Sequence, residues 1–271
     1  MNNMTAIKEL QQIELKILLD VDKVCRENNI QYFLGEGTLL GAIRHHGFIP
    51  WDDDEDLIMK RAEYERFLNI APKALGNRYK VQHFTTVKNY WSPFIKIRLL
   101  DEASKFRQRH IEHLTTDNGP YVDIFPMEYV PRNKSFGQYL QSIQTQYLRS
   151  MLALKVGLHQ PKSLKQRIIK GLSIFYKTET IHRKMDKAFK KYYHLGKTDY
   201  ICTLASYHKV QCQTVLSSVY DETLHMEFEG EWLPVPAGYD LLLTTIYGDY
   251  MTPPPMEQRV IKHYFNGNMA D

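Results

Sequence analysis

The sequence predicts an α+β protein with a mixed β-sheet core flanked by helices and a basic helical appendage. Short apolar or alternating segments typical of strands gather in the first half of the chain, whereas residues 135–195 have a mostly helical pattern. The net charge of the chain also changes near the start of this helical segment. Residues 132–200 contain 15 Lys or Arg against three acidic residues, and the rest contains 20 basic and 28 acidic residues. We therefore predict a catalytic core at 1–131, a basic helical segment at 132–200, and a mixed C-terminal region at 201–271 that packs back on the core.

The elements of the core follow from periodicity and from turn residues. Apolar side chains recur at helical spacing in the first segment, where Ile7, Leu10, Ile17 and Val21 define one face. A short strand leads through the glycines of "IQYFLGEG" into a helix that Thr38 would cap and that Gly47 and Pro50 would end. Helices are predicted at 5–29, 38–46 and 61–75, and strands at 30–34, 54–58, 79–84, 93–100 and 121–125.

Composition narrows the class of protein. The chain has 271 residues, of which 43% are hydrophobic and 24% charged, as expected for a globular protein with a sizeable core. Its three cysteines form no CxxC pair, which argues against a disulfide framework or a structural zinc site. No signal-peptide pattern and no spanning apolar run is visible, so we expect a cytoplasmic protein. The basic helices fit either a solvated face or peripheral contact with the inner face of the membrane. No nucleic-acid-binding module accompanies them, so we expect no nucleic-acid partner.

The segment "WDDDEDLIM", residues 51–59, concentrates more negative charge than a strand can bury without compensation. In a strand at 54–58, Asp54 and Asp56 share one face and Glu55 points away. Two such carboxylates can hold Mg²⁺, which prefers oxygen ligands and binds substrate phosphates as well. An EF-hand beginning at Asp52 is disfavoured, because its sixth position is Leu57 instead of glycine. A glycosyltransferase-type Asp-x-Asp at 52–54 uses the same metal chemistry and stays open.

Two further predicted strands supply charged side chains for the same predicted metal site. Asp123 in "YVDIFPME" lies inside an apolar strand, where a carboxylate is costly unless it is paired or binds metal. In "FIKIRLL", Lys96 and Arg98 alternate onto one face and could hold phosphate oxygens, although a half-exposed strand with its polar side in water would look the same. Asp123 is thus the predicted third carboxylate.

A glycine turn before a helix supports a phosphate site. Gly37 and Thr38 stand at the start of the predicted helix 38–46, and a helix N-terminus presents free backbone N–H groups to an anion. The order of small-residue turn, short helix and Asp-x-Asp strand is the order of the nucleotidyltransferase fold.

Together these segments resemble the LicD family of phosphocholine transferases, whose relatives include the fukutin-related phosphosugar transferases. The similar segments run in family order from about residue 30 to 255: "GTLLGAIRHHGFIPWDDDEDLIM", "FIKIRLLD", "YVDIFPME" and "VPAGYDLLLTTIYGDYMTPPP". The resemblance implies a nucleotidyltransferase-like fold and Mg²⁺-dependent transfer of phosphocholine from CDP-choline to a hydroxyl of a cell-surface glycan precursor, of the teichoic acid or lipopolysaccharide type, which could be lipid-linked. One position departs from the family pattern, since Glu55 stands where an apolar residue is usual.

The resemblance also assigns roles to residues. It implies that Asp54, Asp56 and Asp123 bind the metal, and we predict that these three are catalytic. From the chemistry of phosphoryl transfer we also expect Asp123 to accept the proton of the attacking hydroxyl. The predicted substrate-binding residues are Gly37, Thr38, Arg44, Trp51, Lys96, Arg98 and Tyr121. A quaternary ammonium is held by aromatic faces, for which the candidates are Trp51, Trp91, Tyr121 and Trp232. We expect "YGDYMTPPP" to be a structural closure of the C-terminal region.

Three alternatives stay open from the sequence. The same metal centre could transfer another CDP-linked alcohol phosphate, such as ribitol or glycerol phosphate. A metal-dependent glycosyltransferase could use a UDP-sugar and the residues 52–54. A non-catalytic choline- or glycan-binding module could keep the fold without turnover, although such a module would not need the metal carboxylates and the cationic strand.

Overall fold

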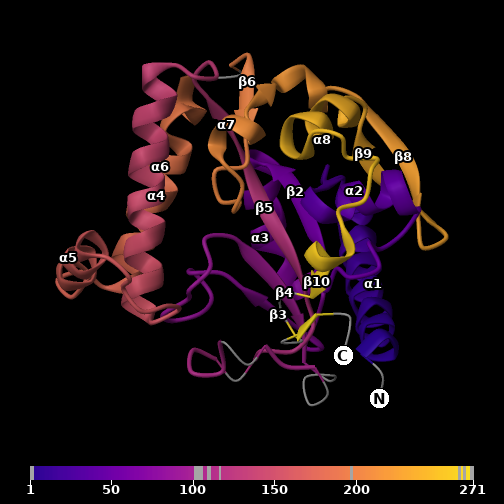
Figure 1. Cartoon of the computed structure of the whole chain (residues 1–271), viewed down its shortest axis with the longest axis horizontal. Coiled ribbons are helices and arrows are strands. Elements are labelled where there is room, and N and C mark those ends of the chain that lie inside the picture. The colour runs from indigo at the N-terminus through magenta and orange to yellow at the C-terminus, as the bar shows by residue number, and fades with distance from the viewer. Residues whose placement is uncertain are drawn as a thin grey trace.

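A central mixed sheet organises the protein (Figure 1). The computed structural model describes residues 3–100, 106–108, 111–115, 117–195, 198–261, 264 and 267–268. Along the sheet the strands follow the order β1-β2-β5-β4-β3, and β6 and β7 extend it from the far end of β5. Their bounds are β1 Phe33–Leu34, β2 Asp56–Lys60, β3 Tyr79–Gln82, β4 Ile95–Leu99, β5 Tyr121–Val130, β6 Tyr200–Cys202 and β7 Val215–Leu216.

The pairing of β2 with β5 is parallel, and every other pairing in this sheet is antiparallel. The register places Asp56 beside Asp123, and Asp123 beside Lys96 on the other side. Because side chains alternate between the faces of a strand, neighbours in register lie on one face. Three charged side chains from three adjacent strands therefore form a row across the sheet.

Helices cover the sheet and continue beyond it. The long helix α1 and the helix α3 contact each other and several strands of the sheet, and α2 follows β1. The basic segment forms α4, α5 and α6, which pack on one another at one side of the molecule (Figure 1). The helix bounds are α1 Asn3–Glu27, α2 Glu36–His45, α3 Arg61–Ala74, α4 Phe136–Val156, α5 Leu164–Ser173, α6 Thr178–Phe189, α7 Val210–Gln213 and α8 Tyr239–Tyr247.

The C-terminal region returns to the core. After β6 and β7 it forms an antiparallel hairpin of β8 (Thr223–Phe228) and β9 (Glu231–Pro236), and then α8 and a small pair of β10 (Val260–Ile261) and β11 (Gly267–Asn268). The hairpin packs against β1 and α2. No helix in the described ranges combines the length and apolarity needed to cross a bilayer.

The predicted α+β class is confirmed, while several boundaries differ from the predictions. The strand after the aspartates begins at Asp56 instead of residue 54, and β5 continues to Val130, five residues beyond its predicted end. The α2 helix begins at Glu36 with Gly35 as its N-cap, so the prediction that Thr38 caps this helix is wrong. The Thr38 hydroxyl instead accepts a hydrogen bond from the Asp56 N–H at 2.8 Å. The side chain thus joins α2 to the start of β2.

A buried ion pair fixes the start of α3 against β5. The Arg61 guanidinium donates to the Glu128 carboxylate, and both side chains are at most 4% exposed. Asp186 of α6 lies 3.3 Å from the same guanidinium. Removing one partner of such a pair leaves an uncompensated buried charge.

We expect Arg61→Met to lower the free energy of unfolding by about 3–5 kcal/mol, because it leaves Glu128 buried without its counter-charge. Lys23→Met is the control: Lys23 of α1 pairs with Glu27 at the surface, and its loss should cost no more than about 1 kcal/mol. Urea unfolding of both variants measures the difference. Equal losses would contradict the assignment of Arg61–Glu128 as a structural pair.

Candidate active site

A cavity of about 430 Å³ opens over the charged row of the sheet. Its floor includes Asp56 of β2, Asp123 of β5 and Lys96 of β4, and Asp52 and Asp54 reach it from the loop before β2. The structure thus brings the predicted site residues Asp54, Asp56, Asp123 and Lys96 to one cavity. Glu55 is absent from the lining and fully buried, which agrees with the prediction that it points away from Asp54 and Asp56.

Backbone hydrogen bonds fix where these carboxylates stand. Besides the bond to Thr38, the Asp56 carbonyl accepts from the Gly35 N–H at 2.9 Å. The Asp123 N–H donates to the Glu55 carbonyl at 2.8 Å, which begins the parallel pairing of β2 and β5. The two strands and the first turn of α2 are thus joined at the residues that line the cavity.

The Lys96 ammonium compensates part of the buried charge. Its Nζ donates to both Asp123 oxygens, at 2.6 and 2.7 Å, and lies 3.8 Å from the centre of the Tyr121 ring. Burial raises the pKa of Asp123 to about 6, although Lys96 opposes this rise. Burial also lowers the pKa of Lys96, and the Asp123 charge opposes that shift. Burial and the neighbouring charges of Asp54 and Asp123 raise the pKa of Asp56 well above its ordinary value.

These groups suit a divalent cation. Carboxylate oxygens are the ligands that Mg²⁺ prefers, and repulsion between Asp54, Asp56 and Asp123 is what a bound cation would relieve. Lys96 leaves lone pairs on both Asp123 oxygens, because a carboxylate has about four acceptor positions. The chemistry of the donor set therefore fits the metal that the sequence predicts.

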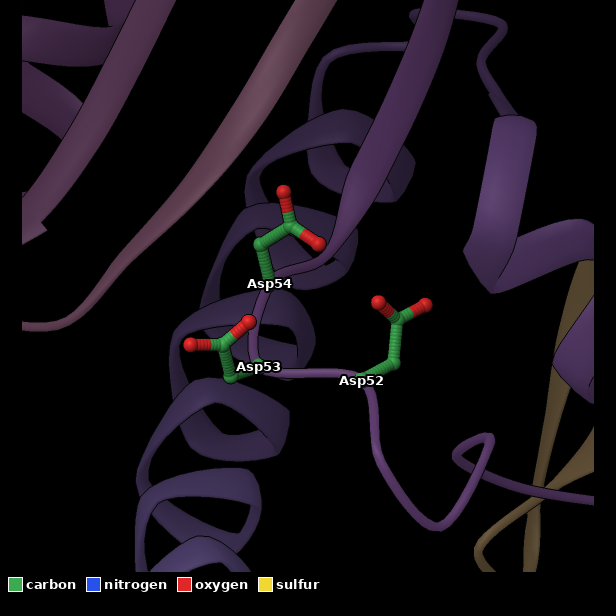
Figure 2. Close-up of side chains that lie close together, drawn as sticks. All are labelled: Asp52, Asp53 and Asp54. Atoms are coloured by element: carbon green, nitrogen blue, oxygen red, sulfur yellow. The ribbon is translucent and has the colours of Figure 1, made fainter. Parts of the chain in front are cut away.

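The consecutive aspartates form a second candidate arrangement. The nearest carboxylate oxygens of Asp52, Asp53 and Asp54 all lie within 4.8 Å of one another. Figure 2 shows the Asp52 and Asp54 side chains extending upward from the loop, while Asp53 extends to the left. Asp53 is fully buried and accepts a hydrogen bond from the Tyr264 N–H at 2.7 Å. Asp52 and Asp54 line the cavity, whereas Asp53 does not.

The predicted substrate-binding residues separate into three that line the cavity, Thr38, which supports it, and three that lie elsewhere. Gly37, Lys96 and Tyr121 line the cavity, and Gly37 is so close to Asp52 that a Cβ atom there would lie 2.5 Å from the Asp52 Oδ2. Thr38 does not line the cavity, but its hydroxyl accepts a hydrogen bond from the Asp56 N–H. The remaining three, which are Arg44, Trp51 and Arg98, lie outside the lining.

Arg44, Arg98 and Trp51 contact other parts of the protein. Arg44 donates to the Tyr250 carbonyl at 2.7 Å, near the opposite end of α2 from the cavity. Arg98 is fully buried and donates to Gln82, Gln108 and the Gly119 carbonyl, so β4 is not the half-exposed strand that the alternation allowed. The Trp51 ring packs against the Arg259 guanidinium at 4.8 Å.

One wall of the cavity was missed from the sequence. It comprises Glu36 at the start of α2, Ser206, Tyr207 and His208 from the loop before α7, and Tyr247 at the end of α8. Trp91 of the predicted aromatic candidates also lines the cavity, whereas Trp232 is 68% exposed on β9 and does not. Tyr247 belongs to "YGDYMTPPP", so this segment, for which only a structural role was predicted, contributes to the cavity lining. An acidic residue between Gly35 and Gly37 was the one local signal for this wall.

Comparisons with known proteins show which family this chain is similar to. A family model described as "LicD/FKTN/FKRP, nucleotidyltransferase domain" matches residues 29–152, a range that holds α2, the aspartate run, β4 and β5. The "Lipopolysaccharide cholinephosphotransferase LicD" of Haemophilus influenzae is 31% identical over 267 residues, which cover 95% of this chain and 96% of that protein. This chain belongs to the LicD family. The predicted family is therefore confirmed.

Shorter matches are found in Rickettsia. An uncharacterized protein of Rickettsia typhi is 36% identical over 78 residues, and one of Rickettsia prowazekii is 38% identical over 68 residues. These matches cover 28% and 25% of this chain, and 25% and 26% of the rickettsial proteins. The similarity to the Haemophilus LicD protein, in contrast, extends over the basic helices and the C-terminal wall of the cavity.

We expect Thr38→Val to lower the free energy of unfolding by about 1–3 kcal/mol, because it leaves the Asp56 N–H without an acceptor in a buried position. Thr38→Ser keeps the hydroxyl and should lose less than half as much. Chemical denaturation of the two variants measures this directly. If Val and Ser lose the same amount, the hydroxyl does not hold β2 in place.

Proposed function

We propose that this protein transfers phosphocholine from CDP-choline to a hydroxyl of a cell-surface glycan, with Mg²⁺ held by Asp54, Asp56 and Asp123. Membership of the LicD family makes the chain a transferase of phosphate-containing groups. The Haemophilus relative is named for choline phosphate and lipopolysaccharide, and this supports the choice of donor group and of acceptor class. The observation that supports this proposal most directly is that Asp56, Asp123 and Lys96 lie in a row at the base of one cavity that Asp54 also lines.

The chain's own groups can perform the parts of such a transfer. Phosphoryl transfer depends mainly on positioning and on neutralising charge at the phosphate. When bound, Mg²⁺ would supply that neutralisation at the diphosphate. The Lys96 ammonium adds positive charge within the same cavity and keeps Asp123 oriented through two hydrogen bonds. With a pKa of about 6, Asp123 is ionised at neutral pH and basic enough to accept the proton of an attacking hydroxyl.

The first test is Mg²⁺-dependent binding of CDP-choline, measured by calorimetry against CDP-ribitol, CDP-glycerol and a UDP-sugar. We expect selective CDP-choline binding that chelation of Mg²⁺ abolishes. Asp54→Asn and Asp56→Asn should remove this binding and lower turnover by at least about a hundredfold, as the loss of a group that stabilises transition-state charge does. Glu222→Gln, an exposed carboxylate change away from the cavity lining, is the control. Preference for another nucleotide contradicts the donor, and full activity in both aspartate variants contradicts the metal site.

The pKa of Asp123 gives this binding a defined pH dependence. The folded protein holds a proton on Asp123 up to about pH 6, above its ordinary value of 3.8, and a metal ligand must be deprotonated. Mg²⁺-dependent affinity should therefore fall as the pH is lowered through about 6, by up to about tenfold per pH unit for each ligand that takes up a proton. Asp56, whose pKa burial and the charges of Asp54 and Asp123 raise, adds to the fall in the same direction. Lys96→Met removes the charge that favours the ionised form and should move the fall to higher pH. An unmoved profile in this variant would contradict the coupling.

We also propose that the basic segment docks on an anionic membrane that carries the acceptor. On α5, Leu164, Ile168 and Leu172 recur every four residues and are 74%, 56% and 45% exposed. Ile174 and Phe175 follow, at 75% and 83%. Such an apolar face within a strongly basic segment is complementary to anionic lipid headgroups. Figure 1 shows α5 at the edge of the molecule, and Leu158 in the loop before it lines the cavity.

Co-sedimentation with vesicles tests this surface. We expect binding to vesicles rich in phosphatidylglycerol that weakens with salt and is much weaker for phosphatidylcholine alone. Ile168→Glu with Phe175→Glu should reduce it at least about tenfold, since each buried side chain of this size contributes about 1.5–3 kcal/mol. Leu224→Glu, at a 41% exposed leucine on β8, is the control. Equal binding by the double variant and the wild type would contradict the proposed docking surface.

A further inference from the structure

The first half of α4 has an apolar outward face and a polar inward face. Four large apolar side chains recur at helical spacing on the outward face and are between 44% and 74% exposed: Phe136, Tyr139, Leu140 and Ile143. The side chains buried in the same stretch are Gln138, Gln141, Ser142 and Thr145. A surface helix ordinarily has the opposite arrangement. The outward face is therefore suited to contact with another molecule.

Hydrogen bonds hold α4 in this orientation. The Gln138 Nε2 donates to the Thr214 hydroxyl at 2.6 Å, in the loop before β7. The Gln141 Nε2 donates to the Ala188 carbonyl of α6 at 3.0 Å. Turning the helix to bury its apolar face would break both bonds and leave the amides to be satisfied elsewhere. The exposure of the apolar face is thus a fixed feature of the fold.

A hollow of about 480 Å³ borders the start of this face. Its lining includes the apolar and aromatic side chains of Pro131, Tyr192 and Tyr200. A Cβ atom on Gly137 would lie 3.3 Å from both the Pro131 Cγ and the Tyr192 hydroxyl oxygen, so the hollow adjoins α4 at the residue after Phe136. A protruding ring and a hollow that could receive a ring therefore stand side by side.

The same hollow is lined by two charges of opposite sign, Arg132 and Asp199. Within the parts of the chain that the structure describes, neither side chain forms an ion pair. Asp199 is one of only three acidic residues in the segment 132–200, and no charged residue stands between Lys134 and Arg149 on α4. The surface around the hollow is therefore far less basic than the rest of this segment.

We propose that this surface binds the same surface of a second copy of the chain in a two-fold symmetric dimer. In such a dimer every contact occurs twice, so one patch must be complementary to itself. Phe136 of one copy can enter the hollow of the other, and Arg132 of one copy can pair with Asp199 of the other. The apolar stripe of α4 carries no Lys or Arg to attract an anionic membrane.

The proposed interface lies apart from the apolar face of α5. The Lys155 ammonium donates to the Ser173 carbonyl at 3.0 Å, which places the end of α5 beside the end of α4. At 1.5 Å per residue, this contact is about 28 Å along α4 from Phe136. Figure 1 shows α5 next to one end of α4 only. Dimer formation therefore leaves the α5 face open, and the inference does not depend on the proposed function.

Sedimentation equilibrium over a concentration series tests the interface. We expect the wild type to dimerise, and Leu140→Glu with Ile143→Glu to weaken association at least about a hundredfold, because the buried centre of an interface carries most of its binding energy. Ile168→Glu with Phe175→Glu, the same change on the exposed face of α5, is the matched control and should leave association unchanged. Thermal unfolding confirms that each variant is folded.

An exchange of charges tests the two-fold pairing itself. Arg132→Asp places two acidic side chains opposite each other and should weaken the dimer about five- to thirtyfold. Asp199→Arg should have a similar effect. The double variant Arg132→Asp with Asp199→Arg restores opposite charges and should associate within about threefold of the wild type. A double variant as weak as either single one would overturn the pairing of Arg132 with Asp199.

The remaining outcomes decide the occupant of this surface. A wild type that stays monomeric throughout the series overturns the dimer. A dimer that persists with Leu140→Glu and Ile143→Glu forms through another surface and overturns the proposal equally. If the wild type is monomeric and this variant loses binding to phosphatidylglycerol vesicles, the occupant is the membrane instead of a second copy.

Discussion

The contact between the Lys96 ammonium and the Asp123 carboxylate, in the middle of the sheet, is the interaction on which the site depends. Both side chains are at least 92% buried, and Asp123 stands in register with Asp56 on the next strand. Two carboxylates so placed would repel each other strongly with no positive charge nearby. Because Lys96 offsets part of this repulsion, the folded chain can keep an acidic centre inside an otherwise apolar sheet.

The backbone around this pair explains why the carboxylates keep their positions. Thr38 and Gly35 bond the amide and carbonyl of Asp56, and the amide of Asp123 bonds the carbonyl of Glu55. The first turn of α2, the start of β2 and the start of β5 are therefore one hydrogen-bonded unit. Two further carboxylates of this region are fully buried, Glu55 and Glu14, and burial raises the pKa of each well above its ordinary value. Burying so many carboxyl groups lowers the folding free energy that the protein gains from this region.

Much of this arrangement could be predicted because it depends on local pattern. Alternation along the predicted strand 54–58 placed Asp54 and Asp56 on one side of Glu55, although β2 itself begins only at Asp56. A single acid in an apolar strand identified Asp123. Alternation could not say which cations reach the cavity: Arg98 shares its strand with Lys96, yet acceptors on β3 and in the loop before β5 take its donors. The wall that contains Glu36, His208 and Tyr247 depends on contacts between residues far apart in the chain. No periodicity links Glu36 with His208 and Tyr247, so only the fold brings them together.

We propose that a divalent cation is bound by Asp56 of β2, Asp123 of β5 and Asp54 of the loop before β2. Anomalous diffraction from crystals soaked in Mn²⁺ and CDP-choline tests it most directly. Our account predicts a metal peak in contact with Asp54, Asp56 and Asp123, next to the donor's phosphates. A peak held by Asp52, Asp53 and Asp54 instead, or no peak where the donor is bound, would contradict it.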